Sequence, residues 1–318
     1  MKPIDISIVV PLYNEEAVFN QLIERLTHVI DLAKFSCEVI LINDGSSDNT
    51  DQLIEEICIK DERFTGVLLS RNHGHQLAVS AGLANVRAKK GVMIIDGDLQ
   101  DPPELITEFY ALLTNGYDVI YAIRKNRKES FFKKLAYSAY YRLQKKISNF
   151  NIPIDSGDFS MLSRRVVDQL NSMPEKSRYL RGMRAWVGFK QIGFEYDRDE
   201  RQAGKTKYSW SKLFELAFNG IFNFSDFPIQ FITRLGFLTI LFSLIYFGYN
   251  VFRKLVYNDV PKGFTATILA IILFSGVQLI SLGLIGEYVL RIYNQVRNRP
   301  LFVVDKVIQD GKIKEEIK

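Results

Sequence analysis

Apolar residues in the first 122 positions follow two alternating patterns. Short runs rich in Val and Ile alternate with longer stretches in which apolar residues recur every three or four positions, and these patterns indicate strands and amphipathic helices. The predicted strands cover residues 6–10, 39–42, 66–69, 92–95 and 119–122. The predicted helices cover residues 17–33, 50–60, 76–89 and 103–115. Strands that alternate with helices predict an α/β fold with a mostly parallel sheet covered on both faces.

Two long apolar segments, residues 229–252 and 264–290, distinguish the last third of the chain. Each is long enough to cross a hydrocarbon core of about 30 Å as a helix that rises about 1.5 Å per residue. We therefore predict two transmembrane helices, the alternative being two buried core helices of a soluble domain. The expected organisation is a catalytic domain over residues 1–228, two spans within residues 229–292 and a tail over residues 293–318.

Residues 208–226, just before the first apolar segment, show apolar positions at helical spacing with Lys207 and Lys212 nearby. This pattern predicts an amphipathic helix that lies in the membrane interface. Packing of the same helix against the sheet domain is the alternative.

Basic residues indicate the orientation in the membrane. Basic residues follow the second apolar segment, among them Arg291, Arg297, Arg299, Lys306, Lys312 and Lys314. The positive-inside rule therefore places the tail, the catalytic domain and both termini in the cytoplasm. The loop between the spans carries Arg253, Lys254 and Lys262, which weakens the asymmetry. We expect an integral membrane protein with two spans.

The net charge of +5 fits nucleic acid, a membrane surface or a phosphorylated substrate. No zinc-finger spacing or RNA-recognition motif is present, so we expect no nucleic-acid partner. Cys37 and Cys58 are too few for a disulfide framework and are expected in the core of a reduced, cytoplasmic protein.

Polar motifs follow three of the predicted strands. In open α/β sheets ligands bind beyond the carboxyl ends of the strands, so residues 11–16 and the carboxylate of Asp44 are placed to contact a nucleotide. Turn chemistry into the next helix explains Gly45, Ser46 and Asp48 equally well, and Asp44 less well.

Asp96 and Asp98 follow the fourth predicted strand directly. Two carboxylates this close repel each other unless a cation lies between them, and a hard divalent ion with oxygen ligands supplies that charge. We therefore predict Mg²⁺ or Mn²⁺ bound to a diphosphate. No phosphate-binding P-loop or dinucleotide Gly-x-Gly-x-x-Gly motif is present, and His73 and His75 lack a third ligand in sequence, so a histidine metal site is not expected.

Six motifs together resemble the family-2, GT-A-type (Rossmann-like) glycosyltransferases, and most closely their polyprenyl-phosphate branch, which contains dolichol-phosphate mannose synthase and bactoprenol glucosyltransferases. The motifs are residues 10–16 (VPLYNEE), 43–48 (NDGSSD), 70–74 (SRNHG), 96–104 (DGDLQDPPE), 155–159 (DSGDF) and 201–208 (RQAGKTKY). Two positions depart from the family pattern. Gly97 replaces the usual alanine, and Asn43 replaces a frequent aspartate, so no role of that carboxylate carries over.

The resemblance implies a set of residues that hold the nucleotide sugar: Pro11, Tyr13, Glu15, Asp44 and Asp96. It implies that the donor is UDP-glucose in preference to GDP-mannose, and that the product is a polyprenyl-phosphate-linked sugar. It also implies self-association, including a tetramer, and residues 301–308 read as a strand that pairs with a neighbouring chain.

The metal and catalytic groups implied by the resemblance are Asp96, Asp98 and Gln100 for the cation, with Asp98 and Asp158 as catalytic residues. Asp158 lies where inverting GT-A enzymes often place their base, and Asp155 is the alternative carboxylate. A turn residue that satisfies backbone N–H groups is the competing interpretation of Asp158.

The acceptor is expected to be a lipid phosphate, which is largely ionised at neutral pH and so needs little base catalysis. Basic residues that follow the fifth predicted strand, and one in the sixth motif, are candidates to bind it: Arg124, Arg127, Lys133, Lys134 and Lys205. A solvated or lipid-facing basic patch is the alternative for any one of them.

Two other functions remain possible at this point. A polysaccharide synthase would need more membrane segments and a Gln-x-x-Arg-Trp signature, which the chain lacks. A non-catalytic scaffold that binds nucleotide sugars is disfavoured by the intact Asp96 and Asp98 pair.

Overall fold

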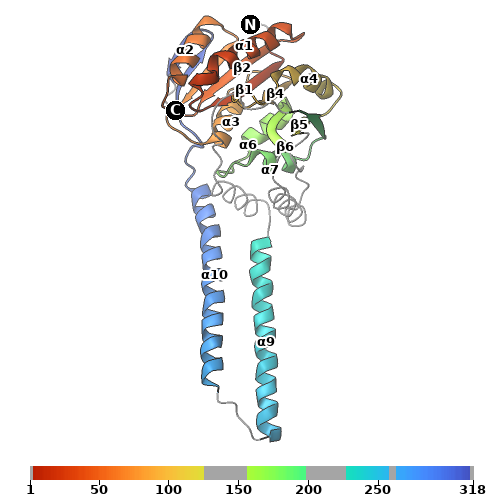
Figure 1. Ribbon diagram of the computed structural model, residues 1–318, viewed down its shortest axis with the longest axis vertical. Coiled ribbons are helices and arrows are strands. Elements are labelled where there is room, and N and C mark those ends of the chain that lie inside the picture. Colours follow the sequence, from red (N-terminus) through yellow and green to blue (C-terminus); the bar gives the residue numbers. More distant parts are fainter. Residues whose placement is uncertain (1–2, 125–155, 198–226, 258–262, 316–318) are drawn as a thin grey trace. The chain divides into compact units, whose positions relative to one another are not determined.

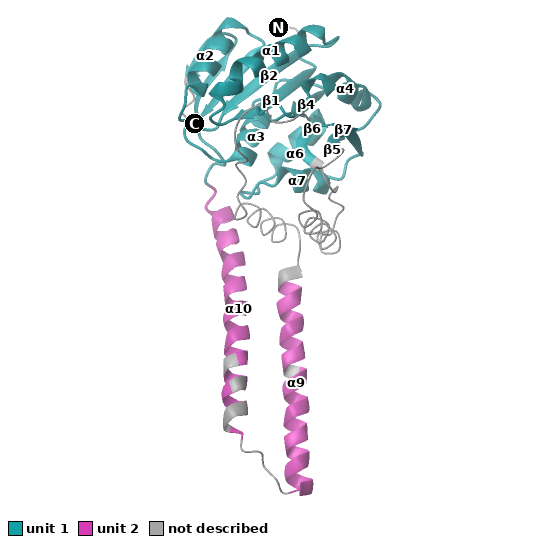
Figure 2. Cartoon of the chain, in the orientation of Figure 1, with its two compact units in different colours: residues 1–146, 150–216, 299–318 teal, residues 147–149, 217–298 magenta. Residues whose placement is uncertain are grey.

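The computed structural model describes residues 3–124, 156–197, 227–257 and 263–315. The chain forms two compact units, shown in different colours in Figure 2. The first comprises residues 1–146, 150–216 and 299–318, and the second comprises residues 147–149 and 217–298.

The first unit is built on a nine-stranded sheet in the described part of the chain, with the order β7-β5-β6-β4-β1-β2-β3-β8-β9 (Figure 1). The strands are β1 (Ile6–Leu12), β2 (Cys37–Asn43), β3 (Phe64–Leu69), β4 (Gly91–Ile94), β5 (Val119–Arg124), β6 (Ser156–Ser163), β7 (Gln191–Tyr196), β8 (Val304–Gln309) and β9 (Lys312–Glu315). All five predicted strands are present. The sheet is mixed: β1 to β4 pair parallel with one another and β5 pairs parallel with β7, whereas β6 and β8 run antiparallel to their neighbours.

Helices cover both faces of this sheet. They are α1 (Glu16–Leu32), α2 (Thr50–Lys60), α3 (His75–Ala84), a 3₁₀ turn η1 (Pro103–Leu105), α4 (Ile106–Thr114), α6 (Arg164–Ser172) and α7 (Leu180–Trp186). In Figure 1, α1, α2 and α4 lie over one face, and α3, α6 and α7 lie over the other. Ile8 and Val10 belong to the apolar core under α1, α2 and α4, whereas Val9 faces Gly82 of α3. Alternate residues of β1 are therefore buried on opposite faces, as a continuous apolar strand requires.

Helix α3 ends earlier than predicted, at Ala84 instead of residue 89. In the residues that follow, the N–H of Arg87 donates to Glu38 at 2.8 Å and the N–H of Ala88 donates to Ser7 Oγ at 3.1 Å. The first bond reaches the buried Glu38 carboxylate and the second reaches Ser7, which itself donates to Glu38 at 2.5 Å, and a continued helix would break both. At α2, Asn49 takes the cap position, while Asp48 accepts the N–H of Thr50 at 3.1 Å.

The segment expected as a C-terminal tail contributes β8 and β9 to the sheet. β8 pairs antiparallel with β3 on one side and with β9 on the other, both within this chain. The expectation that residues 301–308 pair with a neighbouring chain is therefore wrong. Two ion pairs fix the hairpin to the rest of the unit, Arg87 to Asp310 at 3.0 Å and Lys306 to Glu55 at 3.1 Å.

The second unit contains two long apolar helices, α9 (Phe227–Tyr257) and α10 (Phe264–Val296). Within them, residues Ile229–Tyr257 and Leu273–Val296 have mean hydropathies of 1.7 and 1.6, and none of either window is buried. Exposed side chains such as Phe237 and Leu255 need an apolar environment. By length and composition both helices can cross a membrane, and their exposure disfavours the alternative of buried core helices.

Candidate active site

The carboxyl ends of β1 and β2 lie side by side and are joined by hydrogen bonds. The N–H of Asp44 donates to the carbonyl of Leu12 at 2.9 Å. Asn14, which has a φ of 53°, donates its N–H to Ser46 Oγ at 3.0 Å and accepts the N–H of Ser47 at 2.7 Å. The loop that carries Tyr13 and Glu15 is thus fixed against the loop that follows β2.

Asp44 is buried, with 3% of its surface exposed, and it binds the loop before α3. Its carboxylate accepts the N–H groups of His73 at 2.7 Å and Gly74 at 2.9 Å. Burial raises the pKa of Asp44, whereas these two bonds lower it, and the net shift is upward. A Cβ on Gly45 would lie 2.4 Å from backbone atoms of Arg71 and Asn72, so this contact requires glycine.

The predicted nucleotide residues are therefore neighbours, but they differ in access. Pro11 is buried within β1, and Asp44 is engaged by the backbone, whereas Tyr13 is 39% exposed. A bound nucleotide would meet the ring of Tyr13 more directly than the side chain of Asp44.

Asp96 and Asp98 lie just beyond β4, next to the end of β1. One oxygen of Asp98 accepts the N–H of Gln100 at 3.2 Å, and Leu99 has a φ of 61°. Gly97 packs against Leu12, since a Cβ at this position would lie 2.4 Å from Leu12 Cδ2. The glycine that replaces the family's alanine thus has a steric reason in this chain.

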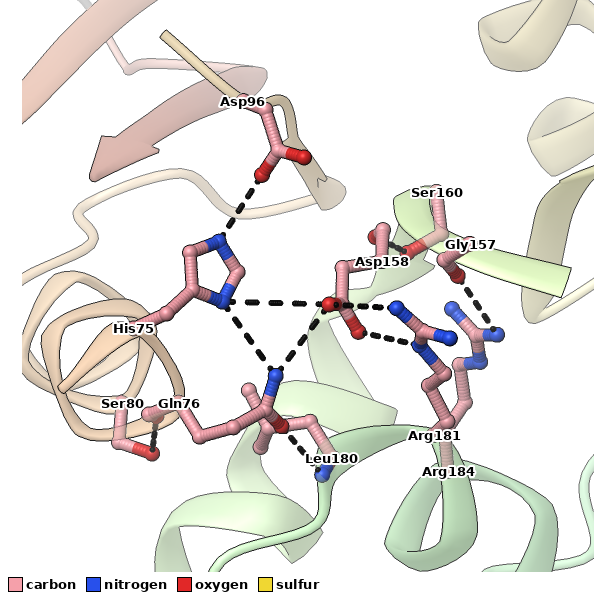
Figure 3. A network of polar contacts seen from close by, with 10 residues as sticks. All are labelled: His75, Gln76, Ser80, Asp96, Gly157, Asp158, Ser160, Leu180, Arg181 and Arg184. Atoms are coloured by element: carbon pink, nitrogen blue, oxygen red, sulfur yellow. Dashed lines mark hydrogen bonds and ion pairs between the residues drawn. The ribbon is translucent and has the colours of Figure 1, made fainter. Parts of the chain in front are cut away.

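His75, at the start of α3, links the two predicted catalytic regions (Figure 3). Its Nε2 lies 2.9 Å from Asp96 Oδ1, and its Nδ1 lies 3.9 Å from Asp158 Oδ2. Burial lowers the pKa of His75, but the hydrogen bond and charge of Asp96 and the charge of Asp158 outweigh it and raise the pKa to about 9. The ring lies between two carboxylates, whose negative charges favour its protonated form.

Asp158, on β6, is held by side chains from α3 and α7. Arg181 donates from Nε and Nη2 to its two oxygens at 2.9 and 3.0 Å, and Gln76 Nε2 donates to Oδ2 at 3.2 Å. Gln76 also accepts the N–H of Leu180 at 2.9 Å, which ties α7 to α3. Burial raises the pKa of Asp158, but the charges of Arg181, His75 and Arg184 outweigh it and hold the pKa below its usual range.

Arg124 ends β5 and lies close to this cluster. Tyr196 donates to Asp101 at 2.5 Å. Burial lowers the pKa of Arg124, but the nearby Tyr196, Asp101 and Asp96 raise it by more, so the net shift is upward. A Cβ on Gly157 would lie 3.7 Å from an Arg124 nitrogen. Arg124 therefore lies next to the segment that carries Asp158, and its role in binding the acceptor phosphate stays a prediction. Arg127, Lys133, Lys134 and Lys205, Asp155, and the predicted helix over residues 208–226 lie outside the described residues.

Several residues at the site carry no sequence signal that points to their role. They are His75, Gln76, Arg181, Arg184 and Tyr196. His75 directly follows one of the six motifs, but a lone histidine gives no indication of a partner more than 20 positions away. The arginines lie on a short helix that follows a weakly patterned region.

The carboxylates offer a partial cation site. Among the described residues, no group of three or more His, Cys, Asp or Glu side chains could hold a metal ion. Asp96 and Asp98 offer hard oxygen donors, and the Asp96 side chain is 29% exposed. Such a pair fits an ion of the Mg²⁺ or Mn²⁺ type that takes its remaining ligands from a diphosphate and water.

The chain is similar to known glycosyltransferases over most of its length. The model of the family "Glycosyl transferase family 2" matches residues 7–170. The chain is 41% identical over 304 residues to the glycosyltransferase YkcC of Bacillus subtilis (strain 168), covering 95% of this chain and 94% of that protein. It is 34% identical over 302 residues to the SfII prophage-derived bactoprenol glucosyl transferase of Shigella flexneri, covering 95% and 97%.

Among solved structures, the mannosyltransferase PcManGT from Pyrobaculum calidifontis, in complex with GDP-Man and Mn²⁺, has a TM-score of 0.46 and 15% identity. The structural match covers 66% of this chain and 60% of the PcManGT chain. The two curated relatives align with nearly the whole chain, so their similarity extends from the sheet unit through the two long helices.

Proposed function

The chain belongs to glycosyl transferase family 2, and we propose that it transfers a hexose, with UDP-glucose as the favoured donor, to a polyprenyl phosphate. The name of the Shigella flexneri relative supports glucose and a polyprenyl acceptor. The observation that carries the proposal is the meeting of two chemistries in one site: the carboxylates of Asp96 and Asp98 lie on one side, and the cations around Asp158 on the other.

In the proposed reaction, an oxygen of the lipid phosphate forms a bond to C1 of the sugar. The bond between C1 and the diphosphate oxygen breaks, and its electron pair leaves with the nucleoside diphosphate. Direct attack of this kind inverts the anomeric carbon. Transition-state stabilisation then requires positive charge at the leaving diphosphate and alignment of the attacking oxygen.

On the donor side, Tyr13 and Glu15 would contact the nucleotide, with Pro11 and Asp44 shaping the loops around it. Asp96, Asp98 and Gln100 would hold a divalent cation, which when bound would supply the positive charge on the diphosphate. His75 fixes the Asp96 carboxylate from the other side at 2.9 Å.

On the acceptor side, Arg124 and the basic residues that follow it would bind the lipid phosphate, together with Lys205. A phosphate monoester carries roughly −1.5 to −2 charge at neutral pH, so its oxygen needs no base. The low pKa of Asp158 supports a role in holding cations in place instead of proton removal.

The membrane arrangement is also a proposal. Helices α9 and α10 would span the bilayer, with the sheet unit and both termini in the cytoplasm and only residues 253–263 outside. This places the site on the side where nucleotide sugars are made and leaves the lipid phosphate in the adjacent leaflet. We also propose that the chain self-associates, although β8 is not the contact.

The function is tested with purified protein and labelled UDP-glucose, other UDP-sugars and GDP-mannose, each with polyprenyl phosphate and a divalent cation. We expect label from UDP-glucose in the organic phase, and less from the others. If label enters the organic phase only from GDP-mannose, the donor is GDP-mannose and not UDP-glucose. No transfer from any donor, with UDP still bound, would support the non-catalytic scaffold.

A further inference from the structure

Two arginines of α7 approach Gly157 and Asp158 of β6 (Figure 3). Arg181 forms a bidentate pair with Asp158, at 2.9 and 3.0 Å. Arg184 follows it on α7, is 4% exposed, and donates to the carbonyl of Gly157 at 3.4 Å. The Asp158 carboxylate is thus paired directly with Arg181, and the charge of Arg184 also acts on it.

Arg184 is incompletely compensated. Its Nε is buried and has no hydrogen-bond partner in the described part of the chain, and its guanidinium lies 5.7 Å from the centre of the Tyr121 ring. Burial lowers its pKa to about 10, although Asp158 acts in the opposite direction. A buried charge without a full complement of partners is costly, so an anion that joins this cluster gains a favourable interaction.

Arg181 is the accessible member of the pair. Its side chain is 33% exposed, compared with 9% for Asp158. Asp158 uses both oxygens to fix the plane of the Arg181 guanidinium. Gln76 and His75 approach the Asp158 carboxylate as well. A guanidinium held in this way presents its charge in a defined orientation, which suits recognition of a phosphate group.

We propose that Arg181, backed by Arg184, binds a phosphate oxyanion of the substrates, and that Asp158 is a positioning residue for Arg181. The inference rests on the proposed function, because that reaction supplies the phosphate groups. The anion is either the diphosphate of the donor or the monoester of the lipid acceptor. Both offer the oxyanion that a guanidinium binds.

The test uses the full-length chain in detergent with two measurements. Calorimetry gives the affinity for UDP, and steady-state kinetics at saturating UDP-glucose give the KM for polyprenyl phosphate. We expect Arg181→Gln to weaken one of them about tenfold or more, as expected for loss of a charge-assisted contact, and to leave the other nearly unchanged. A weaker UDP affinity identifies the donor diphosphate, and a higher KM identifies the acceptor phosphate. Arg184→Gln should weaken the same measurement by a smaller factor.

Arg178→Gln is the matched control. Arg178 lies just before α7, is also partly buried, and donates to the carbonyl of Leu170 at 2.9 Å, away from Asp158. It should leave both measurements unchanged. If Arg181→Gln unfolds the protein, Arg181→Lys keeps the charge without the fork and should give a smaller loss in the same measurement. A folded Arg181→Gln with wild-type UDP affinity and wild-type KM would overturn the proposal.

Asp158→Asn separates positioning from base catalysis. A positioning role predicts that Asp158→Asn weakens the same measurement as Arg181→Gln, equally at pH 6 and pH 8, and that the double variant is little worse than either single variant. A base would give a loss in kcat that eases as the pH rises past the second phosphate pKa near ~6, and that result would refute positioning. If the wild-type protein transfers no sugar, the proposed function fails, while the UDP measurement with competing inorganic phosphate still tests Arg181.

Discussion

Replacement of Gly97 by alanine tests why the residue between Asp96 and Asp98 lacks a side chain. A Cβ at Gly97 would lie 2.4 Å from Leu12 Cδ2 and 3.3 Å from the carbonyl oxygen of Pro11. Carbon atoms pack at about 3.5–4.0 Å, so the Leu12 methyl must move by roughly 1 Å. Leu12 is 1% exposed, so this movement takes place in a packed core.

The cost follows from overpacking, which typically destabilises by about 1–3 kcal/mol. Because the clash involves the end of a flexible side chain, we expect about 1–2 kcal/mol for Gly97→Ala. In a domain of this size, each kcal/mol lowers Tm by about 2–4 °C, so the expected fall is about 2–8 °C. Transfer should fall as well, by up to about 10²-fold, because the flanking carboxylates shift with the loop.

Leu12→Val supplies the matched control. It removes the clashing methyl, and the next atom of Leu12, Cγ, would lie 3.7 Å from the new Cβ, an ordinary contact. Leu12→Val alone should cost about 1 kcal/mol for the lost methylene. The double variant should then be more stable than the sum of the two single losses predicts, by about 1 kcal/mol, and should recover transfer.

The assay is thermal unfolding of the full-length protein, read by intrinsic fluorescence, with the transfer rate measured in parallel. Additive losses in Tm, or a Gly97→Ala variant with wild-type Tm and rate, would refute the steric explanation. The departure from the family's alanine would then be a neutral replacement.

Three further predictions concern the metal, the hairpin and the membrane. Asp98→Ala should abolish transfer, because one carboxylate of the proposed cation site is lost; full activity of this variant in chelator would remove the metal assignment. Arg87→Met should lower the free energy of unfolding by about 3–5 kcal/mol, because it leaves the 1%-exposed Glu38 carboxylate without its cation. This loss should appear as a large fall in Tm, and the double variant Arg87→Met with Glu38→Gln should recover much of the lost stability. A membrane-impermeant amine reagent on sealed right-side-out cells should spare Lys145, and labelling there would invert the proposed topology.

The sequence by itself determined the parallel half of the sheet, the two long apolar helices and the cluster of strand-end motifs. Each of these features depends on local pattern. The Val and Ile runs of β1, β2 and β4 are buried whichever strand pairs with them, and the position of Asp96 directly after β4 follows from the end of that run. The identity of the family followed from the order of the motifs for the same reason.

Tertiary structure alone decided which distant residues meet. The sequence of β8 indicates a strand but not its partner. In the folded chain β8 pairs with the edge of β3 in the same sheet and not with a neighbouring chain. Likewise, His75, Gln76 and Arg181 become part of the site because α3 and α7 converge on Asp158, and His75 is separated from Asp158 by 83 positions of the chain. Such contacts depend on the packing of whole elements and leave no periodic signal in the residues that make them. The charges around Asp158, on which its proposed positioning role rests, therefore emerged only from the folded chain.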